Sequence, residues 1–227
     1  VARYVYLING ARLEAYRSIT ASGTANISNG HYYRNDSQLK SGDMVLMDYA
    51  PDFRYYVSDI GRMWPVNGVY EPWQRELLQI ILEYRNVVLD IIRPGITTDQ
   101  ILEEAQKKMK PIMRRYKFSK NIYKKAAEKM VKTGGGVLSH PVGLAVHDDG
   151  PYRKGPLKVG HVFSVDPQMW VPEENLYLRY EDTVVVTENG NENFTDFLPS
   201  ELDDLEALVQ GKGMLQSFPE DLMKWNY

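Results

Sequence analysis

The spacing of apolar residues predicts three helices in the middle of the chain. Over residues 72–92 apolar side chains recur every three or four positions, which is the spacing of one helix face. A second helix begins at Thr97, where Gln100 three positions later forms a capping box, and Pro111 is expected to kink or break this helix. The same spacing predicts a third helix over residues 120–132.

Strands are predicted before and after these helices. The opening VARYVYLI is interpreted as a short strand rather than a helix start or a signal peptide, and loops with short strands follow up to Gly42. MVLMDYA and RYYVSDI then predict two strands joined by a tight turn at Pro51 and Asp52. Beyond the helices, HVFSVDPQMWV and LYLRYEDTVVVTE predict further strands.

The order strands, helices, strands favours an α+β domain, in which helices pack on one face of an antiparallel sheet. We interpret residues 1–227 as one domain that ends at residues 199–227 in a short helix and a tail. No internal repeat or linker divides it, and 227 residues are enough to bury a sizeable core.

The composition narrows the classes of function. Apolar residues make up 43% and charged residues 25% of the chain, which is ordinary for a soluble globular protein. The net charge of −3 gives no general case for nucleic acid, and the apolar runs are too short to span a membrane. The chain has no cysteine, so disulfides and thiolate metal sites are excluded. The compartment stays open, with the cytoplasm slightly favoured.

Basic residues crowd the segment from Lys107 to Lys132, where Glu128 is the single acid. An anionic partner is one interpretation of this segment. A solvated helical face is the other, and we favour it because the chain as a whole is negative.

Two aspartates at predicted strand ends are the first candidates for chemistry. Asp48 and Asp59 are eleven residues apart, and a hairpin would fold these positions back beside each other. Two carboxylates at that distance repel each other unless a cation lies between them or one is protonated. Aspartates at strand ends are also common as turn or capping residues, so the pair alone decides nothing.

A second cluster is SHPVGLAVHDDG, which contains two of the four histidines of the chain, His140 and His147. It follows the glycine run Gly134, Gly135 and Gly136, which would let the backbone approach a ligand closely. The histidines are either ligands or ordinary packed residues, and the sequence leaves both interpretations open.

Asp166 and Glu181 complete the candidates, each within or beside a very apolar strand. A carboxylate buried there needs a cation or a base nearby, and Arg179 is available as one partner. Salt bridges, or a register in which the acids face water, would explain them equally well. Taken together, hard oxygen ligands and one imidazole suit Mn²⁺, Co²⁺, Fe²⁺ or Zn²⁺ rather than a closed structural zinc site.

These residues stand in motifs that resemble the pita-bread metallopeptidases, the family of aminopeptidase P and prolidase. The family carries a YxxDITRTxPVNG-like stretch, then SHxxGLxxHD, VEPG and RxED. This chain has LMDYAPDFRYYVSDIGRMWPVNG, LSHPVGLAVHD, SVDPQ and LRYED in the same order. The stretches PVNG, SHxxGLxVHD and TENGNEN are most similar to those of aminopeptidase P.

The resemblance implies a role for each of these residues. Asp59 and Glu181 would bridge two metal ions. His147 would contact the substrate and the developing oxyanion, His31 would line the substrate pocket, and Arg179 would support the ligand carboxylates. The implied metal ligands are Asp48, Asp59, His140, Asp166 and Glu181.

The implied activity is hydrolysis of the peptide bond before proline, with a proline-containing peptide as substrate and no nucleic acid or membrane as partner. Two divalent metal ions would serve as cofactors, manganese being the most expected and cobalt, zinc or iron the alternatives. Tyr32, Tyr33 and Trp64 are available to hold the proline ring. The alternative is a metal-free binding module or pseudoenzyme, because the pita-bread fold also serves histone chaperones and the metal-independent creatinase.

The chain departs from the family pattern at a few positions. Asp166 stands where the family has a glutamate that is both ligand and proton shuttle. Gly136 stands where the family often has another histidine, and Gly61 replaces a threonine that supports the bridging aspartate. The resemblance also begins after the first helices of the catalytic domain. We therefore expect a second chain, either a separate N-terminal piece or another copy, to cover the exposed sheet face.

Overall fold

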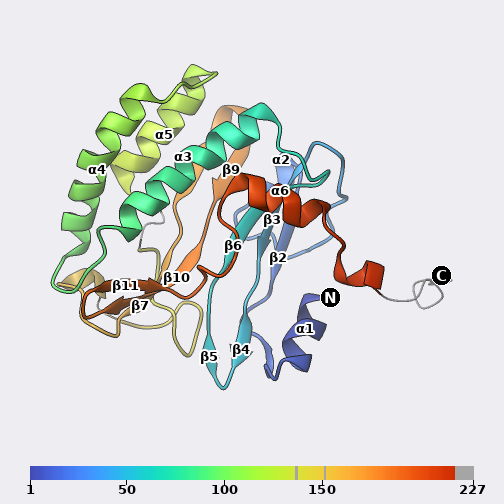
Figure 1. Cartoon of the computed structure of the whole chain (residues 1–227), viewed down its shortest axis with the longest axis horizontal. Helices are drawn as coiled ribbons and strands as arrows, with labels where there is room; N and C mark the ends of the chain where they lie inside the picture. Colours follow the sequence, from blue (N-terminus) through green and yellow to red (C-terminus); the bar gives the residue numbers. More distant parts are fainter. Residues whose placement is uncertain (136–137, 151, 218–227) are drawn as a thin grey trace.

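A computed structural model describes residues 1–135, 138–150 and 152–217 of the chain (Figure 1). The helices are α1 (Ala2–Ile8), α2 (Thr24–Ile27), α3 (Pro72–Leu89), α4 (Thr98–Arg115), α5 (Asn121–Thr133) and α6 (Leu202–Gln210), with 3-10 turns η1 (Tyr152–Lys154), η2 (Pro172–Glu174) and η3 (Met214–Ser217). The strands are β1 (Leu13–Glu14), β2 (Ile19–Ser22), β3 (Met44–Asp48), β4 (Pro51–Phe53), β5 (Tyr56–Val57), β6 (Gly61–Pro65), β7 (Val162–Val165), β8 (Gln168–Val171), β9 (Leu176–Arg179), β10 (Asp182–Thr187) and β11 (Gly190–Asn193).

The described strands form small antiparallel sheets with the orders β1-β4-β5, β2-β3-β6, β11-β10-β7 and β8-β9. Helices α3, α4 and α5 lie together on one side, and α5 packs on β8 while α3 packs on β9 (Figure 1). This arrangement confirms the predicted α+β class, with antiparallel sheets and a layer of helices.

The three central helices form where the apolar spacing predicts them. A capping box between Glu71 and Gln74 and a proline in the first turn begin α3. Thr97 caps α4, because its hydroxyl accepts a hydrogen bond from the Gln100 amide at 3.3 Å. The expected break at Pro111 does not occur, and α4 continues to Arg115. Pro111 is exposed, so water can replace the backbone hydrogen bond that proline removes.

A glycine ends α5 for a steric reason. Gly134 adopts the left-handed conformation at φ 63°, which glycine reaches without a penalty. A β-carbon at this position would lie 2.2 Å from the Leu102 side chain, so the glycine also lets α4 and α5 pack closely.

The N-terminal segment is a helix, and the predicted strand is wrong. Residues 2–8 form α1, none of whose residues is buried, and the Asn9 side chain donates to the Val5 carbonyl at 2.8 Å. A strand needs a neighbour to satisfy its backbone groups, whereas a helix closes these bonds within itself. No described strand pairs with this segment, so its β-branched and aromatic residues do not decide its conformation.

The turn predicted at Pro51 and Asp52 is also wrong, because both residues lie in β4 and pair with β1. The chain turns at Arg54 and Tyr55 instead, with φ angles of 54° and 72°. A two-residue hairpin turn requires positive φ at both central positions, which proline cannot adopt. The resulting hairpin β4–β5 follows β3 and precedes β6 along the chain. Strands β3 and β6 pair directly with each other.

Each of the two strands predicted after the helices is interrupted once, and the two interruptions lie opposite each other. The first forms β7 and β8, and the second forms β9 and β10. Strands β7 and β10 pair on one side of the breaks, with Asp182 opposite Val165. Strands β8 and β9 pair on the other side, with Gln168 opposite Arg179. Pro167 lies at one break and has no N–H to donate to a ladder. The breaks place Asp166 and Glu181 outside the ladders and beside each other.

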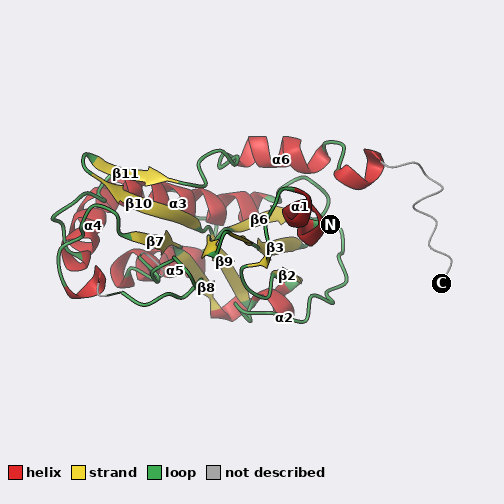
Figure 2. Cartoon of the chain, turned by 90° about the horizontal axis from the view of Figure 1, so that it is seen from below, coloured by secondary structure: helices red, strands yellow, loops and turns green. Residues whose placement is uncertain are grey.

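Helices α6 and α2 lie on opposite sides of β2, β3 and β6 (Figure 2). The side chains of Met44, Leu46 and Met63 pack into the main core, while the alternate residues of β3 and β6 face α1 and α6. None of the described helices is long and apolar enough to cross a membrane.

Candidate metal centre

The candidate metal ligands come from five separate segments that meet at one end of the sheets. Asp48 ends β3, Asp59 precedes β6, and the two histidines lie in the loop between α5 and β7. These segments enclose a pocket of about 390 Å³. Among the residues that line it are Asp48, Asp59, His140, His147, Asp166, Glu181, His31 and Arg179.

Strand pairing brings the carboxylates together. Asp48 pairs with Gly61 in the β3–β6 register, so Asp59 returns to the same end of the hairpin. Gly61 also forms a bridge with Glu181, with N···O distances of 3.3 and 3.0 Å between their backbones. A β-carbon on Gly61 would lie 3.0 Å from the Glu181 β-carbon, so the glycine permits this close approach.

The predicted ligands other than Asp166 have ligand atoms close enough to share a metal ion, whereas Asp166 belongs to neither of the groups that meet this condition. Oxygen atoms of Asp48, Asp59 and Glu181 all lie within 4.8 Å of one another. One ion with metal–oxygen bonds of about 2.0–2.6 Å can bridge such a separation. Ligand atoms of Asp59, His140 and His147 meet the same 4.8 Å limit. His140 Nε2 lies 3.3 Å from Asp59 Oδ2 and 3.9 Å from Glu181 Oε1.

These carboxyl groups are buried and crowded, and their pKa values reflect it. Burial raises the pKa of Asp48 to about 6, that of Asp166 to about 7, and that of Glu181 well above its usual range. For Asp59 burial also acts upward, but hydrogen bonds with His140 and Tyr16 outweigh it and lower the pKa. The metal-free pocket therefore holds protons that a divalent cation would displace.

Two oxygen atoms in the pocket fit the expected cation. Asp166 Oδ1 and Glu181 Oε2 are buried and have no hydrogen-bond partner among the described residues. Buried polar atoms are rarely left without a partner. Together with the carboxylate and imidazole donor set, these oxygens match what Mn²⁺, Co²⁺, Fe²⁺ or Zn²⁺ requires.

The pKa values of the three pocket histidines are shifted in different directions. Burial lowers the pKa of His140, but the hydrogen bond to Asp59 outweighs it and raises the value overall. Burial and the neighbouring His140 lower the pKa of His147, whose ring centroid lies 4.1 Å from that of His140. Burial and Arg179 lower the pKa of His31. His147 and His31 thus favour the neutral imidazole, which can accept or donate a hydrogen bond.

Arg179 lies among three of the carboxylates. It contacts Asp48 directly, and its Nη1 lies 3.3 Å from Glu181 Oε2 and 3.5 Å from Asp166 Oδ2. The guanidinium partly compensates the negative charge of the pocket and holds side chains from three segments in place.

Three further residues that contact the pocket carboxylates escaped the sequence analysis. The Tyr16 hydroxyl donates to Asp48 and, at 2.7 Å, to Asp59. The Ser164 hydroxyl donates to Glu181 Oε1 at 2.7 Å, and the Gln168 amide donates to Asp166. No spacing signal marks Tyr16, which lies far from the motifs in sequence. Ser164 and Gln168 each stand two residues from Asp166, and the alternation of side chains along a strand could have indicated them.

A buried ion cluster supports the backbone behind Glu181. Arg62 donates to the Glu181 carbonyl at 2.5 Å and to Asp182 at 2.8 Å, and Arg85 from α3 donates to Asp182 at 2.5 Å. Breaking one partner of such a buried cluster leaves an uncompensated charge, so the cluster ties β6, β10 and α3 firmly together.

The expectation about the aromatic residues around a proline ring needs correction, and the expectation about Gly136 concerns a residue outside the described part of the chain. Of the aromatic residues expected to hold a proline ring, Tyr33 lines the pocket. Trp64 does not, because it faces the other side of β6 in a groove beside α6. Tyr32 packs against the main core and is not among the pocket residues. Gly136 lies outside the described residues.

We expect the stability of the metal-free protein to fall as the pH rises. The folded pKa values of about 6 for Asp48 and about 7 for Asp166 exceed the usual 3.8, so the folded state retains protons that the unfolded state has released. This contribution is complete below about pH 4 and is lost as the pH rises through 6 to 7. Calorimetric Tm values in chelator across this range measure it.

The Asp166→Asn variant is the control for this pH dependence, since it removes one of the titrating groups and should give a shallower fall. A Tm in chelator that rises across the same range would contradict the raised pKa values. Adding Mn²⁺ at the alkaline end should restore the lost stability, because the ion replaces the protons.

Comparison with known proteins agrees with this geometry. The model of metallopeptidase family M24 matches residues 1–188. The Xaa-Pro aminopeptidase of Escherichia coli K12 is 34% identical over 220 residues, which cover 88% of this chain and 48% of that protein. Mouse Xaa-Pro aminopeptidase 3 is 36% identical over 215 residues, covering 88% and 41%.

Solved structures give the same result. Proline aminopeptidase P II from Yersinia pestis superimposes with a TM-score of 0.76 at 32% sequence identity, covering 91% of this chain and 50% of that one. The chain spans about half the length of the curated relatives it matches.

Proposed function

The chain belongs to metallopeptidase family M24 and has the pita-bread fold of aminopeptidase P, and from this premise we propose that it hydrolyses the peptide bond before proline with two divalent metal ions. The observation that supports the proposal most is the meeting of Asp48, Asp59 and Glu181 within 4.8 Å, with His140 beside them. Burying these carboxylates without a cation would be unfavourable, and a site is stronger support for a function than a fold.

Each residue of the pocket has a proposed task. Asp48, Asp59, His140, Asp166 and Glu181 hold the ions, of which manganese is the most expected, with cobalt, zinc or iron as alternatives. When bound, such ions lower the pKa of a water molecule and polarise the substrate carbonyl. Arg179 and Tyr16 keep the carboxylates of Asp48 and its neighbours oriented.

The residues that line the pocket bind the substrate and transfer protons to and from it. His147 donates a hydrogen bond to the oxygen of the scissile carbonyl as negative charge develops there. Asp166 takes up the proton that the attacking water loses and passes it to the proline nitrogen as the peptide C–N bond breaks. His31 and Tyr33 line the space next to these groups, and Ile19 and Val146 give it the apolar character that a proline ring requires.

A metal-free binding module or pseudoenzyme is the second candidate, and one observation favours it. The Arg179 guanidinium already lies among Asp48, Asp166 and Glu181 and supplies a positive charge of its own. One guanidinium compensates one of several carboxylates, and two buried carboxylate oxygens accept no hydrogen bond from the described residues. We therefore favour the metallopeptidase.

The deciding assay uses the metal-loaded protein with an Xaa-Pro dipeptide and an Xaa-Pro-Xaa tripeptide. Cleavage of either supports the proposal, and the preferred length separates a dipeptidase from an aminopeptidase. No cleavage together with no bound metal would favour the binding module. Cleavage of peptides without proline alone would keep the mechanism and discard the specificity.

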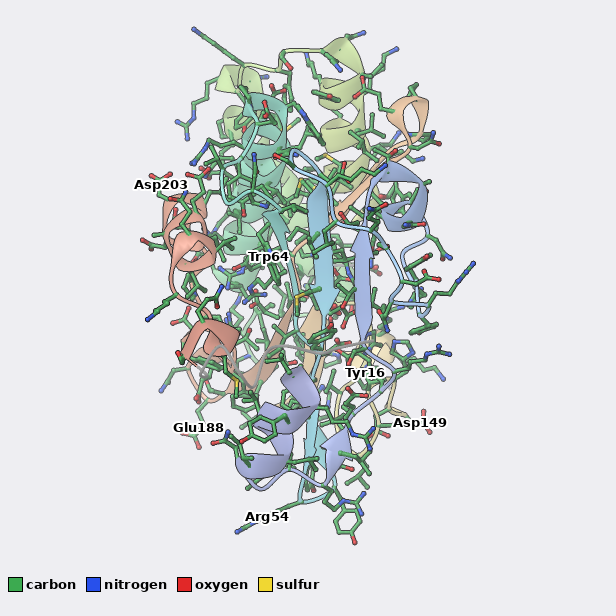
Figure 3. The ribbon with its side chains drawn as sticks, turned by 90° about the vertical axis from the view of Figure 1, so that its right-hand side faces the viewer. Tyr16, Arg54, Trp64, Asp149, Glu188 and Asp203 are labelled. Atoms are coloured by element: carbon green, nitrogen blue, oxygen red, sulfur yellow. The ribbon has the colours of Figure 1, made fainter. Side chains whose placement is uncertain are left out.

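A second polypeptide is proposed to cover the outer face of β3 and β6. This face bears an apolar groove of about 810 Å³ between α1 and the segment 194–198. Trp64 lies in this groove, on the side of the strands that carries α6, while Tyr16 lies toward the metal centre (Figure 3). Most of the side chains that line the groove are apolar, and a partner seated there would remove them from water. The covering chain is either a separate N-terminal piece or another copy.

We expect the isolated chain to self-associate through this groove. Light scattering should show a mass above 26.2 kDa, and Trp64→Glu should lower it by placing a charge in the groove. Trp170→Glu is the matched control, because Trp170 is exposed on β8 and lies outside the groove. A stable monomer in wild type would remove support for self-association.

A further inference from the structure

Asp166 is held in place by its neighbour two positions along the chain. The Gln168 side-chain amide donates to Asp166 Oδ2, and Arg179 Nη1 lies 3.5 Å from the same oxygen. Gln168 lines the pocket, although it is neither an acid nor a histidine. In the family motif the two positions are occupied by glutamate and glycine, whereas this chain has aspartate and glutamine.

Strand pairing explains why both donors reach one oxygen. Gln168 and Arg179 are directly opposite each other in the β8–β9 ladder, so their side chains leave the same face of the hairpin. The backbone N–H of Gln168 donates to the Gly135 carbonyl at 3.1 Å, which ties the start of β8 to the end of α5. The position of the Gln168 side chain is therefore fixed by two elements.

The second oxygen of Asp166 is left available. Asp166 is 1% exposed, and its Oδ1 is buried without a hydrogen-bond partner among the described residues. With both donors on Oδ2, Oδ1 is the oxygen of this carboxyl group that is left for an ion. An aspartate is one methylene shorter than a glutamate, so its carboxyl group tolerates less misplacement before it loses an ion.

We propose that Gln168 is a positioning residue that offsets the short side chain of Asp166, holding Oδ2 so that Oδ1 can bind a metal ion. The inference rests on the proposed function of the pocket. A neutral amide suits this task because it adds no positive charge that would repel the ion, as an arginine or lysine at this position would. Glycine at position 168 could not supply the hydrogen bond.

The test compares Mn²⁺ binding by calorimetry and electron paramagnetic resonance in four proteins: wild type, Gln168→Met, Asp166→Glu and Asp166→Glu/Gln168→Gly. Methionine has nearly the volume of glutamine but no donor. Gln168→Met should weaken Mn²⁺ binding about 10-fold or more, as removing hydrogen bonds to ligands does elsewhere. The double variant should bind at least as well as wild type, because the longer carboxyl group no longer needs the amide.

The matched control is Gln106→Met, which removes an amide donor to the Lys132 carbonyl between α4 and α5 and should leave Mn²⁺ binding unchanged. If Gln168→Met does not fold, Gln168→Asn replaces it, because this shorter amide cannot reach Oδ2. Unchanged affinity in the Gln168 variant would overturn the inference. A loss of similar size on adding Gln168→Gly to Asp166→Glu would also overturn it, since that result indicates a general structural role.

The inference can fail separately from the proposed function. A wild-type protein that binds no Mn²⁺ contradicts the metallopeptidase. The crystal structure of Gln168→Met then decides the positioning role: a carboxyl group of Asp166 that rotates away supports it, and an unmoved one refutes it.

Discussion

Replacing His140 by alanine is expected to remove the metal from the protein. His140 Nε2 lies 3.3 Å from Asp59 and 3.9 Å from Glu181, so it faces the same space as the two carboxylates proposed to bridge the ions. Removing a residue that only orients a ligand typically costs 10–100-fold in affinity, and removing a direct ligand should cost more than about 100-fold. Activity should be lost to a similar extent.

Elemental analysis after dialysis, together with titration of Mn²⁺, measures this effect. The control is His161→Ala, because His161 is the histidine outside the pocket and contacts the Lys158 backbone. The two variants should have similar Tm values in chelator, apart from the loss of the Asp59 contact. Full Mn²⁺ binding by His140→Ala would refute the proposed ligand set.

Replacing His147 by alanine is expected to leave the metal in place and to lower kcat about 10²–10³-fold, as the loss of one oxyanion donor does in other hydrolases. Its imidazole lines the pocket, and burial and His140 both favour the neutral form. The proposed hydrogen bond strengthens as charge develops on the substrate, so kcat should fall more than KM rises.

Steady-state kinetics on an Xaa-Pro substrate and metal content measured on the same sample separate the two possible roles of His147. Its ligand atom lies within 4.8 Å of those of Asp59 and His140, so the geometry also allows it to bind an ion. Loss of metal in His147→Ala would identify it as a ligand. Unchanged kcat would remove it from the mechanism.

Periodicity predicted the central helices well because their boundaries follow from local chemistry. A capping residue such as Thr97 and a left-handed glycine such as Gly134 act within a few positions of the chain. The N-terminal helix was missed because its residues favour strands, and the deciding factor was the lack of a neighbouring strand. Such a factor is set by the tertiary structure and leaves no local signal.

The motif acids and histidines were found from the sequence because each motif carries its own flanking residues. Their mutual distances depend on strand register and on the bridge between Gly61 and Glu181, which no single motif contains. Tyr16 and Gln168 were missed because their importance lies in what they touch. A hydroxyl or amide donor becomes recognisable only when its carboxylate partner is known.

The close approach of Gly61 to the Glu181 side chain affects which substitutions this pocket accepts. A side chain there would meet the Glu181 β-carbon at 3.0 Å and Oε2 at 3.1 Å, and Glu181 is fixed from behind by Arg62. Gly61→Thr, which introduces the residue of the family motif, would require Glu181 and the β9–β10 segment to give way by a few tenths of an ångström. The effect of a threonine at this position is thus coupled to the residues around Glu181, and it depends on which other substitutions preceded it.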